Sequence, residues 1–268
     1  MVRLLLASLL ALAVWGTPVA RAFAADKKVC KDSVLCVGLN AHYDFEEGSD
    51  AAREASDSLG VFNEPDGQNI GNATGKFGNA VAFTGSSTSY LHIPETGNFG
   101  NEFYSLVFWV YPTSAGSAGQ KQAIISTNSA NSRGETLYLE NVSGNLQARW
   151  TVTLNDDTTV TASSATNLAL STWHMIVVWV YPDFVTSATT DLIGVSINGA
   201  VSTTAALDKP VKAGLSQIRL GGQPYTGTEQ PFTGRIDHFT SFEGYLTPAE
   251  ITLLYNSGSG RAFPFSTP

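Results

Sequence analysis

The carboxylate side chains are the first candidates for chemistry in this sequence. A retaining glycosidase needs two carboxyl groups roughly 5 Å apart. Glu46 and Glu47 are adjacent, so on a strand their side chains point to opposite faces. Asp156 and Asp157 follow Asn155 in a polar segment typical of a turn between two Thr- and Val-rich strands. Neither spacing predicts a hydrolytic carboxylate pair.

The four histidines are scattered over separate strand-like segments, at His42, His92, His174 and His238. Neither a Gly-x-Ser-x-Gly elbow nor a zinc-binding spacing accompanies them. We therefore expect hydrogen-bonding roles for them and a protein that is not an enzyme. A cryptic glycoside hydrolase or polysaccharide lyase, whose residues meet only in space, stays as the weaker alternative.

The N-terminal residues predict export. Arg3 precedes an apolar run over residues 4–15, and small residues surround Ala22-Phe23-Ala24, an A-x-A-like cleavage site. The run has 12 residues, whereas a membrane-spanning helix needs roughly 20. We expect residues 1–24 to be a cleavable signal peptide, no membrane span, and a protein that is secreted or held at the cell surface.

Cys30 and Cys36 are the only two cysteines, and they lie in the expected leader over residues 25–37. An oxidising compartment favours a disulfide between them. Two free thiols are the alternative, and a metal pair is the weakest option because no partner Cys or nearby His completes a tetrahedral set.

The charge excludes some partners. The whole chain carries a net charge of −8, and removal of the two Arg of the signal peptide makes it −10. Nucleic acids and anionic membranes attract Lys/Arg patches, so we expect neither as a partner. An acidic surface is compatible with a cation or a neutral glycan.

The elements that must position any site are short β-strands separated by turn residues. Asn198-Gly199, between two apolar strands, is a strong hairpin signal. Many such strands with little helical periodicity predict an all-β sandwich or barrel. We expect strands near residues 39–45, 80–83, 90–93, 104–111, 123–126, 135–139, 146–153, 158–162, 174–180, 194–197, 200–204, 217–220 and 234–242.

One short helix is expected near the C-terminus. Thr247 is its N-cap, Pro248 occupies the first helical position and Glu250 completes a capping box. Two similar segments, residues 106–112 and 176–182, each carry a Trp and end in Pro. We expect them to be central strands buried on both faces, with the two Trp residues as core anchors.

In order along the chain, these segments resemble the laminin-G-like, concanavalin A-like lectin modules common in exported bacterial proteins. The resemblance implies an all-β, concanavalin A-like jelly-roll sandwich with one short C-terminal helix, over residues 38–260, followed by a tail over residues 261–268. The matching segments are residues 38–48, 56–58, 75–85, 108–112, 172–174, 195–199, 218–222, 232–237, 246–251 and 254–256.

The resemblance also implies a structural Ca²⁺ at one edge of the sandwich. Its ligands would be Asp57, Asp237 and the backbone carbonyl of Asn79, with Glu47 orienting the site. The alternative is that Asp57 forms an Asx turn and Asp237 is a buried hydrogen-bonded carboxylate. His238 stands where the family often has a second Asp, and the segment before Gly75 lacks the usual Gly-Asn run, which weakens the match.

A lectin-type sandwich further implies a polysaccharide or glycoprotein partner, bound through exposed aromatic faces. Trp150, Tyr138 and Tyr225 are not accounted for by the matching segments, and we take them as candidate sugar contacts. The alternative for each is an ordinary core or half-buried position. The rival function is an extracellular structural or adhesive protein that makes protein–protein contacts.

Overall fold

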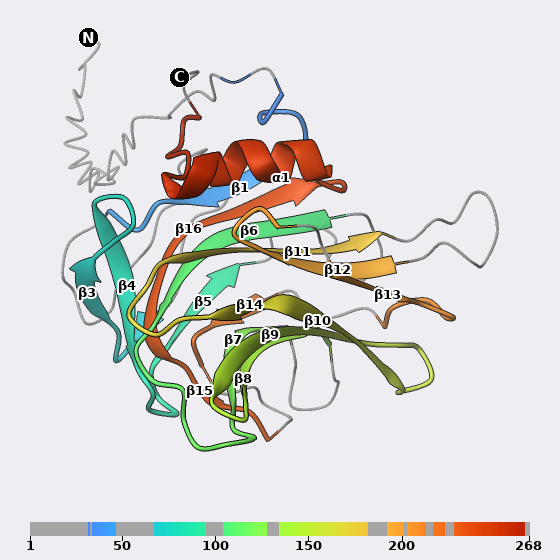
Figure 1. Cartoon of the computed structure of the whole chain (residues 1–268), viewed down its shortest axis with the longest axis horizontal. Coiled ribbons are helices and arrows are strands. Elements are labelled where there is room, and N and C mark those ends of the chain that lie inside the picture. Colours follow the sequence, from blue (N-terminus) through green and yellow to red (C-terminus); the bar gives the residue numbers. More distant parts are fainter. Residues whose placement is uncertain are drawn as a thin grey trace, which may run out of the picture.

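The computed structural model describes residues 32, 34–46, 67–94, 104–127, 134–181, 192–200, 203–212, 217–222 and 228–265. These residues form two β-sheets stacked face to face, with one helix above the upper sheet (Figure 1). The expected all-β jelly-roll sandwich with one short C-terminal helix is confirmed.

The first sheet has eight strands in the order β13-β12-β11-β6-β16-β4-β3, with β1 also paired to β16. All of its pairs are antiparallel. Its strands are β1 (Leu39–Tyr43), β3 (Gly71–Thr74), β4 (Asn79–Thr84), β6 (Tyr104–Pro112), β11 (His174–Tyr181), β12 (Leu192–Ile197), β13 (Thr203–Ala206) and β16 (Thr233–Glu243).

The second sheet follows the order β10-β9-β8-β7-β14-β5-β2 and is antiparallel, except that β15 pairs with β7 in parallel. Strand β7 bulges between Ala123 and Ile125. Its strands are β2 (Gly67–Gln68), β5 (Tyr90–Pro94), β7 (Lys121–Ser126), β8 (Thr136–Val142), β9 (Asn145–Thr153), β10 (Thr159–Leu168), β14 (Gln217–Leu220) and β15 (Gln230–Pro231).

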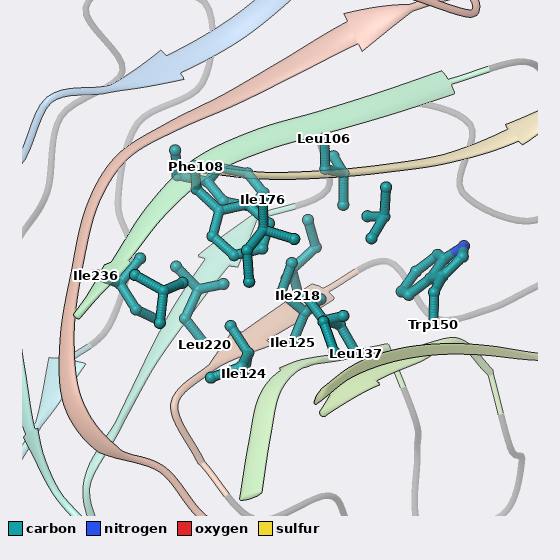
Figure 2. Packing of buried hydrophobic residues seen from close by; sticks show 14 of the residues in the cluster. Leu106, Phe108, Ile124, Ile125, Leu137, Trp150, Ile176, Ile218, Leu220 and Ile236 are labelled. Carbon is teal, nitrogen blue, oxygen red and sulfur yellow. The ribbon is translucent and has the colours of Figure 1, made fainter. Parts of the chain in front are cut away.

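The core lies between the sheets, as Figure 2 shows. Alternate side chains of each strand point inward, which follows from the two-residue repeat of a strand. Phe108 and Ile176 enter from the first sheet and meet Leu137, Trp150 and Ile218 from the second, all fully buried. Burying a large apolar side chain stabilises the fold by roughly 1.5–3 kcal/mol, so this layer dominates stability.

A second core lies on the outer face of the first sheet. Trp109 and Trp179, both predicted to be buried, point outward from β6 and β11 with exposed fractions of 3% and 2%. Tyr255 of helix α1 (Pro248–Tyr255) packs on Trp109, Tyr245 just before the helix packs on Trp179, and Ile251 and Leu254 of the helix are buried in the same cluster. The expectation that both central strands are buried on both faces is confirmed.

Helix α1 begins as its sequence predicts. Thr247 accepts a hydrogen bond from the Glu250 backbone N–H, and the Glu250 carboxylate accepts one from the Thr247 backbone N–H, which completes the capping box. The helix ends at Asn256, in the left-handed region at φ 47°. A short 3₁₀ turn, η1 (Asn256–Gly258), follows.

Residues 261–265, the described part of the expected C-terminal tail, pack against the second core. Phe263 and Phe265 are buried in the second core with exposed fractions of 5% and 3%. The Arg261 guanidinium donates to the buried Asp32 carboxylate at 2.8 Å and forms an ion pair with it. Leu35 is also buried there, so described residues before 38 and after 260 both contribute to the second core.

Candidate cation site and binding face

Asp237 is a buried carboxylate on the outward side of β16. It lies opposite Trp109 in the register with β6, and its exposed fraction is 0%. Its Oδ2 accepts a hydrogen bond from the Phe77 backbone N–H at 2.9 Å, whereas its Oδ1 has no hydrogen-bond partner among the described residues. Burial raises the pKa of Asp237 to about 8, although backbone N–H groups of Phe77 and Lys76 oppose the rise.

The turn between β3 and β4 places backbone oxygen beside this carboxylate. A Cβ added at Gly75 would lie 2.5 Å from the Asn79 carbonyl oxygen and 2.6 Å from Asp237 Oδ2. Both oxygens therefore border the same small space, which is open because residue 75 is glycine. Asp237 and the Asn79 carbonyl were predicted to share a cation site, and in the structure the two groups border the same space.

Glu46 adds a second carboxylate to this turn. Its Oε1 accepts a hydrogen bond from the Asn79 backbone N–H at 3.0 Å, and its charge is one of the causes that raise the pKa of Asp237. Glu47 was the residue predicted to orient the site, and both Glu47 and Asp57 lie outside the described residues. The signal for Glu46 was present, since it precedes Glu47 in the same matching segment.

The donor set fits a hard cation such as Ca²⁺, which takes carboxylate and carbonyl oxygens. Asp237 would supply Oδ1, which lacks a hydrogen-bond partner, Asn79 its carbonyl and Glu46 its carboxylate. Among the residues described, no group of three His, Cys, Asp or Glu side chains forms a metal cluster. The remaining coordination would have to come from other oxygens or water.

The outer face of the second sheet carries polar and aromatic side chains. On β8, Tyr138 points away from the core because Leu137 and Leu139 point into it. The Lys121 ammonium lies over the Tyr138 ring, 4.8 Å from its centroid. Next to Tyr138 in the strand register, Arg149 forms an ion pair with Glu140, with Nε and Oε2 2.9 Å apart.

A pocket opens beside these residues, where β15 joins β7. Its volume is about 470 Å³, and its described lining consists of Gly119, Gln120, Lys121, Thr228 and Gln230. Gln122, next to Lys121 in β7, is buried, and its side-chain amide donates to the Ser114 carbonyl oxygen and accepts from the Thr233 backbone N–H. Residues with amide, ammonium and hydroxyl side chains therefore line a single cavity, and one of them, Lys121, contacts an aromatic ring.

The other predicted contacts have different outcomes. Trp150 is fully buried in the main core, contrary to the expectation of an exposed sugar platform, because β9 turns Leu146, Ala148 and Trp150 inward. Tyr138 does lie on the outer face but keeps an exposed fraction of only 7%. Tyr225 lies outside the described residues, and so does Cys30. The pairing of Cys30 with Cys36 stays a prediction.

The four polar pocket residues, Gln120, Lys121, Thr228 and Gln230, were not among the predicted site residues. Thr228 and Gln230 follow a polar stretch around Tyr225, and Gln120 and Lys121 precede an expected strand. Neither segment carries a sequence pattern that predicts contact with the other. Parallel pairing of β15 with β7, through Gln230 and Gln122, brings them together.

Among the described residues, two buried carboxylates have a strongly raised pKa, Glu135 and Asp237, and they do not face each other as a catalytic pair. Glu135, which precedes β8, is fully buried, and burial raises its pKa to about 7, although a hydrogen bond from Tyr104 lowers it. The other carboxylate with a strongly raised pKa, Asp237, belongs to the opposite sheet. Paired carboxylates for glycoside hydrolysis must face one substrate, which this placement does not provide.

The described part of the chain contains no helix long and apolar enough to cross a membrane.

Solved structures with the same fold include domain 4 of AbnA, a GH43 extracellular arabinanase from Geobacillus stearothermophilus, in complex with arabinotriose. The two chains share 22% sequence identity with a TM-score of 0.58, over 80% of this chain and 96% of that domain. At this identity the likeness shows the fold alone.

Toxin binding domains are also similar in structure. The binding domain of Paraclostridial Mosquitocidal Protein 1 matches at 15% identity and a TM-score of 0.62, over 82% of this chain and 52% of that one. The botulinum neurotoxin serotype D domain in complex with N-acetylneuraminic acid matches at 15% identity and 0.60, over 82% and 50%. This chain therefore spans about half the length of these toxin domains.

No curated protein matches the chain in sequence. A family model described as the concanavalin A-like lectin/glucanases superfamily matches residues 84–252, which is more than half of the chain. The matched range includes β6, β11 and β16 at the centre of the first sheet, the pocket between β7 and β15, and most of helix α1. The chain therefore belongs to the concanavalin A-like lectin/glucanase superfamily.

Proposed function

We propose that this protein is an exported carbohydrate-binding module that recognises a polysaccharide or the glycan of a glycoprotein. The observation that carries the proposal is the pocket between β7 and β15, where Gln120, Lys121, Thr228 and Gln230 converge beside Tyr138. Small-ligand sites are concave and contain a few convergent polar groups. Planar amides and ammonium groups match the paired hydroxyls of a sugar ring.

The structural relatives support a glycan as the ligand class. Arabinotriose is bound in the structure of the arabinanase domain, and N-acetylneuraminic acid in that of the serotype D toxin domain. The predicted signal peptide over residues 1–24 supports export. An exported module would meet such glycans outside the cell.

A glycan array with residues 25–268, in millimolar calcium and in a duplicate treated with EDTA, tests the proposal. We expect binding to a defined glycan class. The paired substitution Lys121→Ala and Gln230→Ala should weaken it by roughly tenfold or more, equivalent to about 1.4 kcal/mol. Lys209→Ala is the matched control, because Lys209 pairs with Asp156 at the turn after β9, away from the pocket.

One outcome would argue against the pocket as the site, and another would argue against the function. Binding that the pocket substitutions leave unchanged would place the site elsewhere on the sandwich. Binding to no glycan, together with capture of a defined protein partner, would favour the adhesive alternative.

We also propose that Asp237, the Asn79 carbonyl and Glu46 hold one structural Ca²⁺. Support comes from the buried Oδ1 of Asp237, which has no hydrogen-bond partner among the described residues, and from the space that Gly75 leaves open beside Oδ2 of the same carboxylate and the Asn79 carbonyl oxygen. The ion would join the β3–β4 turn to β16 and would stabilise the fold. Isothermal titration with Ca²⁺ against wild type and Asp237→Asn tests it, and equal heats from both proteins would contradict it.

A further inference from the structure

A second set of side chains suited to a sugar lies on the outer face of the first sheet, beyond the part that helix α1 covers. We call helix α1 and the segment up to Phe265 the cover. The cover extends to Trp109, which stacks with Tyr255 at a centroid distance of 6.1 Å. Two residues further along β6, Tyr111 is partly exposed, and so are its neighbours Trp173 and Arg235. We call Tyr111, Trp173 and Arg235 the aromatic row.

The strand register builds this row. Arg235 of β16 lies opposite Tyr111 of β6, and Trp173 immediately precedes β11, whose first residue His174 pairs with Val110. Strands β16, β6 and β11 are neighbours in the first sheet, as Figure 1 shows. The three side chains therefore cross three adjacent strands in one line.

Contacts hold the row in a fixed geometry. The Tyr111 and Trp173 ring centroids are 5.3 Å apart with the rings tilted by 54°. The Arg235 guanidinium lies 4.8 Å from the centre of the Tyr111 ring, and its Nη1 donates to the Thr74 carbonyl oxygen at 3.0 Å. The turn before Trp173 is anchored, because the Ser171 backbone N–H donates to the Pro112 carbonyl oxygen at 2.8 Å. Such preorganisation lowers the entropy cost of binding.

Hydroxyl groups border the row on the side away from helix α1. Thr233 shares the outer face with Arg235, since the two are two residues apart on β16. Thr84 lies opposite Thr233 in the register, and the exposed Thr113 donates its hydroxyl to the Thr233 carbonyl oxygen. The row thus combines an indole, a planar guanidinium and nearby hydroxyls.

This chemistry fits a sugar ring better than a protein partner. The electron-rich face of an indole attracts the C–H groups of a pyranose or furanose, and guanidinium and hydroxyl groups hydrogen-bond its hydroxyls. A stable protein interface buries about 800 Å² on each partner, far more than three half-buried side chains supply. We propose that the aromatic row is a second carbohydrate-contact surface, which takes a neutral sugar ring against Trp173.

The inference rests on the proposed function and extends it. The pocket lies on the second sheet and the row on the first, so the two surfaces belong to opposite sheets. One molecule would then contact two glycan segments at once and would cross-link or align polysaccharide chains.

Trp173 makes the proposal testable by chemical footprinting. Of the described tryptophans, Trp109, Trp150 and Trp179 are buried at 3%, 0% and 2% exposure, and only Trp173 is partly exposed. N-bromosuccinimide should therefore oxidise Trp173 first in residues 25–268, as read by peptide mass spectrometry. Short neutral oligosaccharides of arabinose, xylose, glucose and mannose are the probes, and a binding one should protect Trp173.

Affinity measurements on variants complete the test. We expect Trp173→Leu to weaken binding of the protecting oligosaccharide by roughly tenfold, and Trp173→Tyr to restore most of it because an aromatic face remains. Tyr181→Leu is the matched control, since it removes a partly exposed ring from the other end of β11. Circular dichroism of each variant shows that it is folded.

The outcomes separate the two proposals. Protection of Trp173 that persists in the Lys121→Ala, Gln230→Ala variant supports the row as an independent surface. An oligosaccharide that binds the pocket but neither protects Trp173 nor responds to Trp173→Leu overturns the row and leaves the proposed function. A response only to Trp173 overturns the pocket and leaves the row, and no binding by any probe contradicts both.

Discussion

On the first sheet, Trp109, Val177 and Trp179 point outward and are covered by helix α1 and the segment up to Phe265. On the second sheet, Gln147 and Arg149 point outward and stay partly exposed. The strands of both sheets alternate in the same way, so the difference lies in the outward residues alone. An apolar outer face needs a cover, and a polar outer face is available for a ligand.

Removing an outward tryptophan from the first sheet should have the largest effect. Trp109→Ala leaves a cavity beneath Tyr255 and Phe77, and large aromatic truncations in cores cost about 3–5 kcal/mol. Urea denaturation measures the free energy of unfolding. Arg149→Ala on the second sheet is the control, with an expected cost of about 1 kcal/mol or less because its ion pair is partly exposed. Equal costs would abolish the distinction between the two faces.

Glu135 tests the cost of a buried carboxylate at the start of β8. Burial raises its folded-state pKa from 4.5 to about 7, so the neutral form is favoured in the folded protein. The favourable contribution of the protonated Glu135 to the free energy of unfolding is fully present below about pH 4.5 and is lost as the pH rises through about 7. Glu135→Gln should therefore be near neutral at acidic pH and stabilising by about 3 kcal/mol above pH 8, at 1.36 kcal/mol per pKa unit.

Unfolding free energies of wild type and Glu135→Gln across this pH range provide the check. A constant difference between the two proteins at all pH values would mean that Glu135 does not titrate near neutrality.

Calcium should stabilise the fold through the proposed site on the first sheet, at Asp237 of β16 and Asn79 of β4. At a Ca²⁺ concentration of about 100 Kd, a single site stabilises the fold by about 2.7 kcal/mol. Asp237→Asn should remove this gain, and in EDTA it should be no less stable than wild type because it eliminates a buried carboxylate. Thermal unfolding with and without Ca²⁺ measures both effects. A calcium response that survives Asp237→Asn would place the ion elsewhere.

The smallest effect concerns the cover itself. Thr247→Ala removes the hydroxyl that caps helix α1, and loss of an N-cap costs about 1 kcal/mol. Hydrogen exchange should increase in α1 and in the β11 backbone beneath it, and stay unchanged in β8 and β9. Faster exchange in both sheets alike would show that the cover and the sandwich open as one unit.

Local patterns predicted much of the fold. Asn198-Gly199 forms the expected turn, with φ of 55° and 70°, and Thr247 and Glu250 form the expected capping box. The strands β2, β3 and β15 were not predicted, because two- and four-residue strands depend on their partners for stability. The expected strand over residues 200–204 is described only from Thr203, as β13.

The site was harder to predict, and Trp150 shows why. Leu146, Ala148, Trp150 and Val152 alternate with Gln147, Arg149 and Thr151, so strand periodicity alone places Trp150 in the core. Trp150 was predicted to be a sugar contact only because no motif accounted for it, and that prediction ignored the two-residue repeat of β9. The pocket depends on pairing between β7 and β15, more than a hundred residues apart in sequence, which no local pattern indicates.

The ion pair between Asp32 and Arg261 determines where the two ends of the described range lie. It fastens both ends of the described unit on the side of helix α1, since Leu35 and Phe263 are buried there together. Both ends of the described range therefore lie on the outer face of the first sheet, beside the second core. The pocket between β7 and β15 belongs to the second sheet, so the two described ends do not lie on the sheet that carries it.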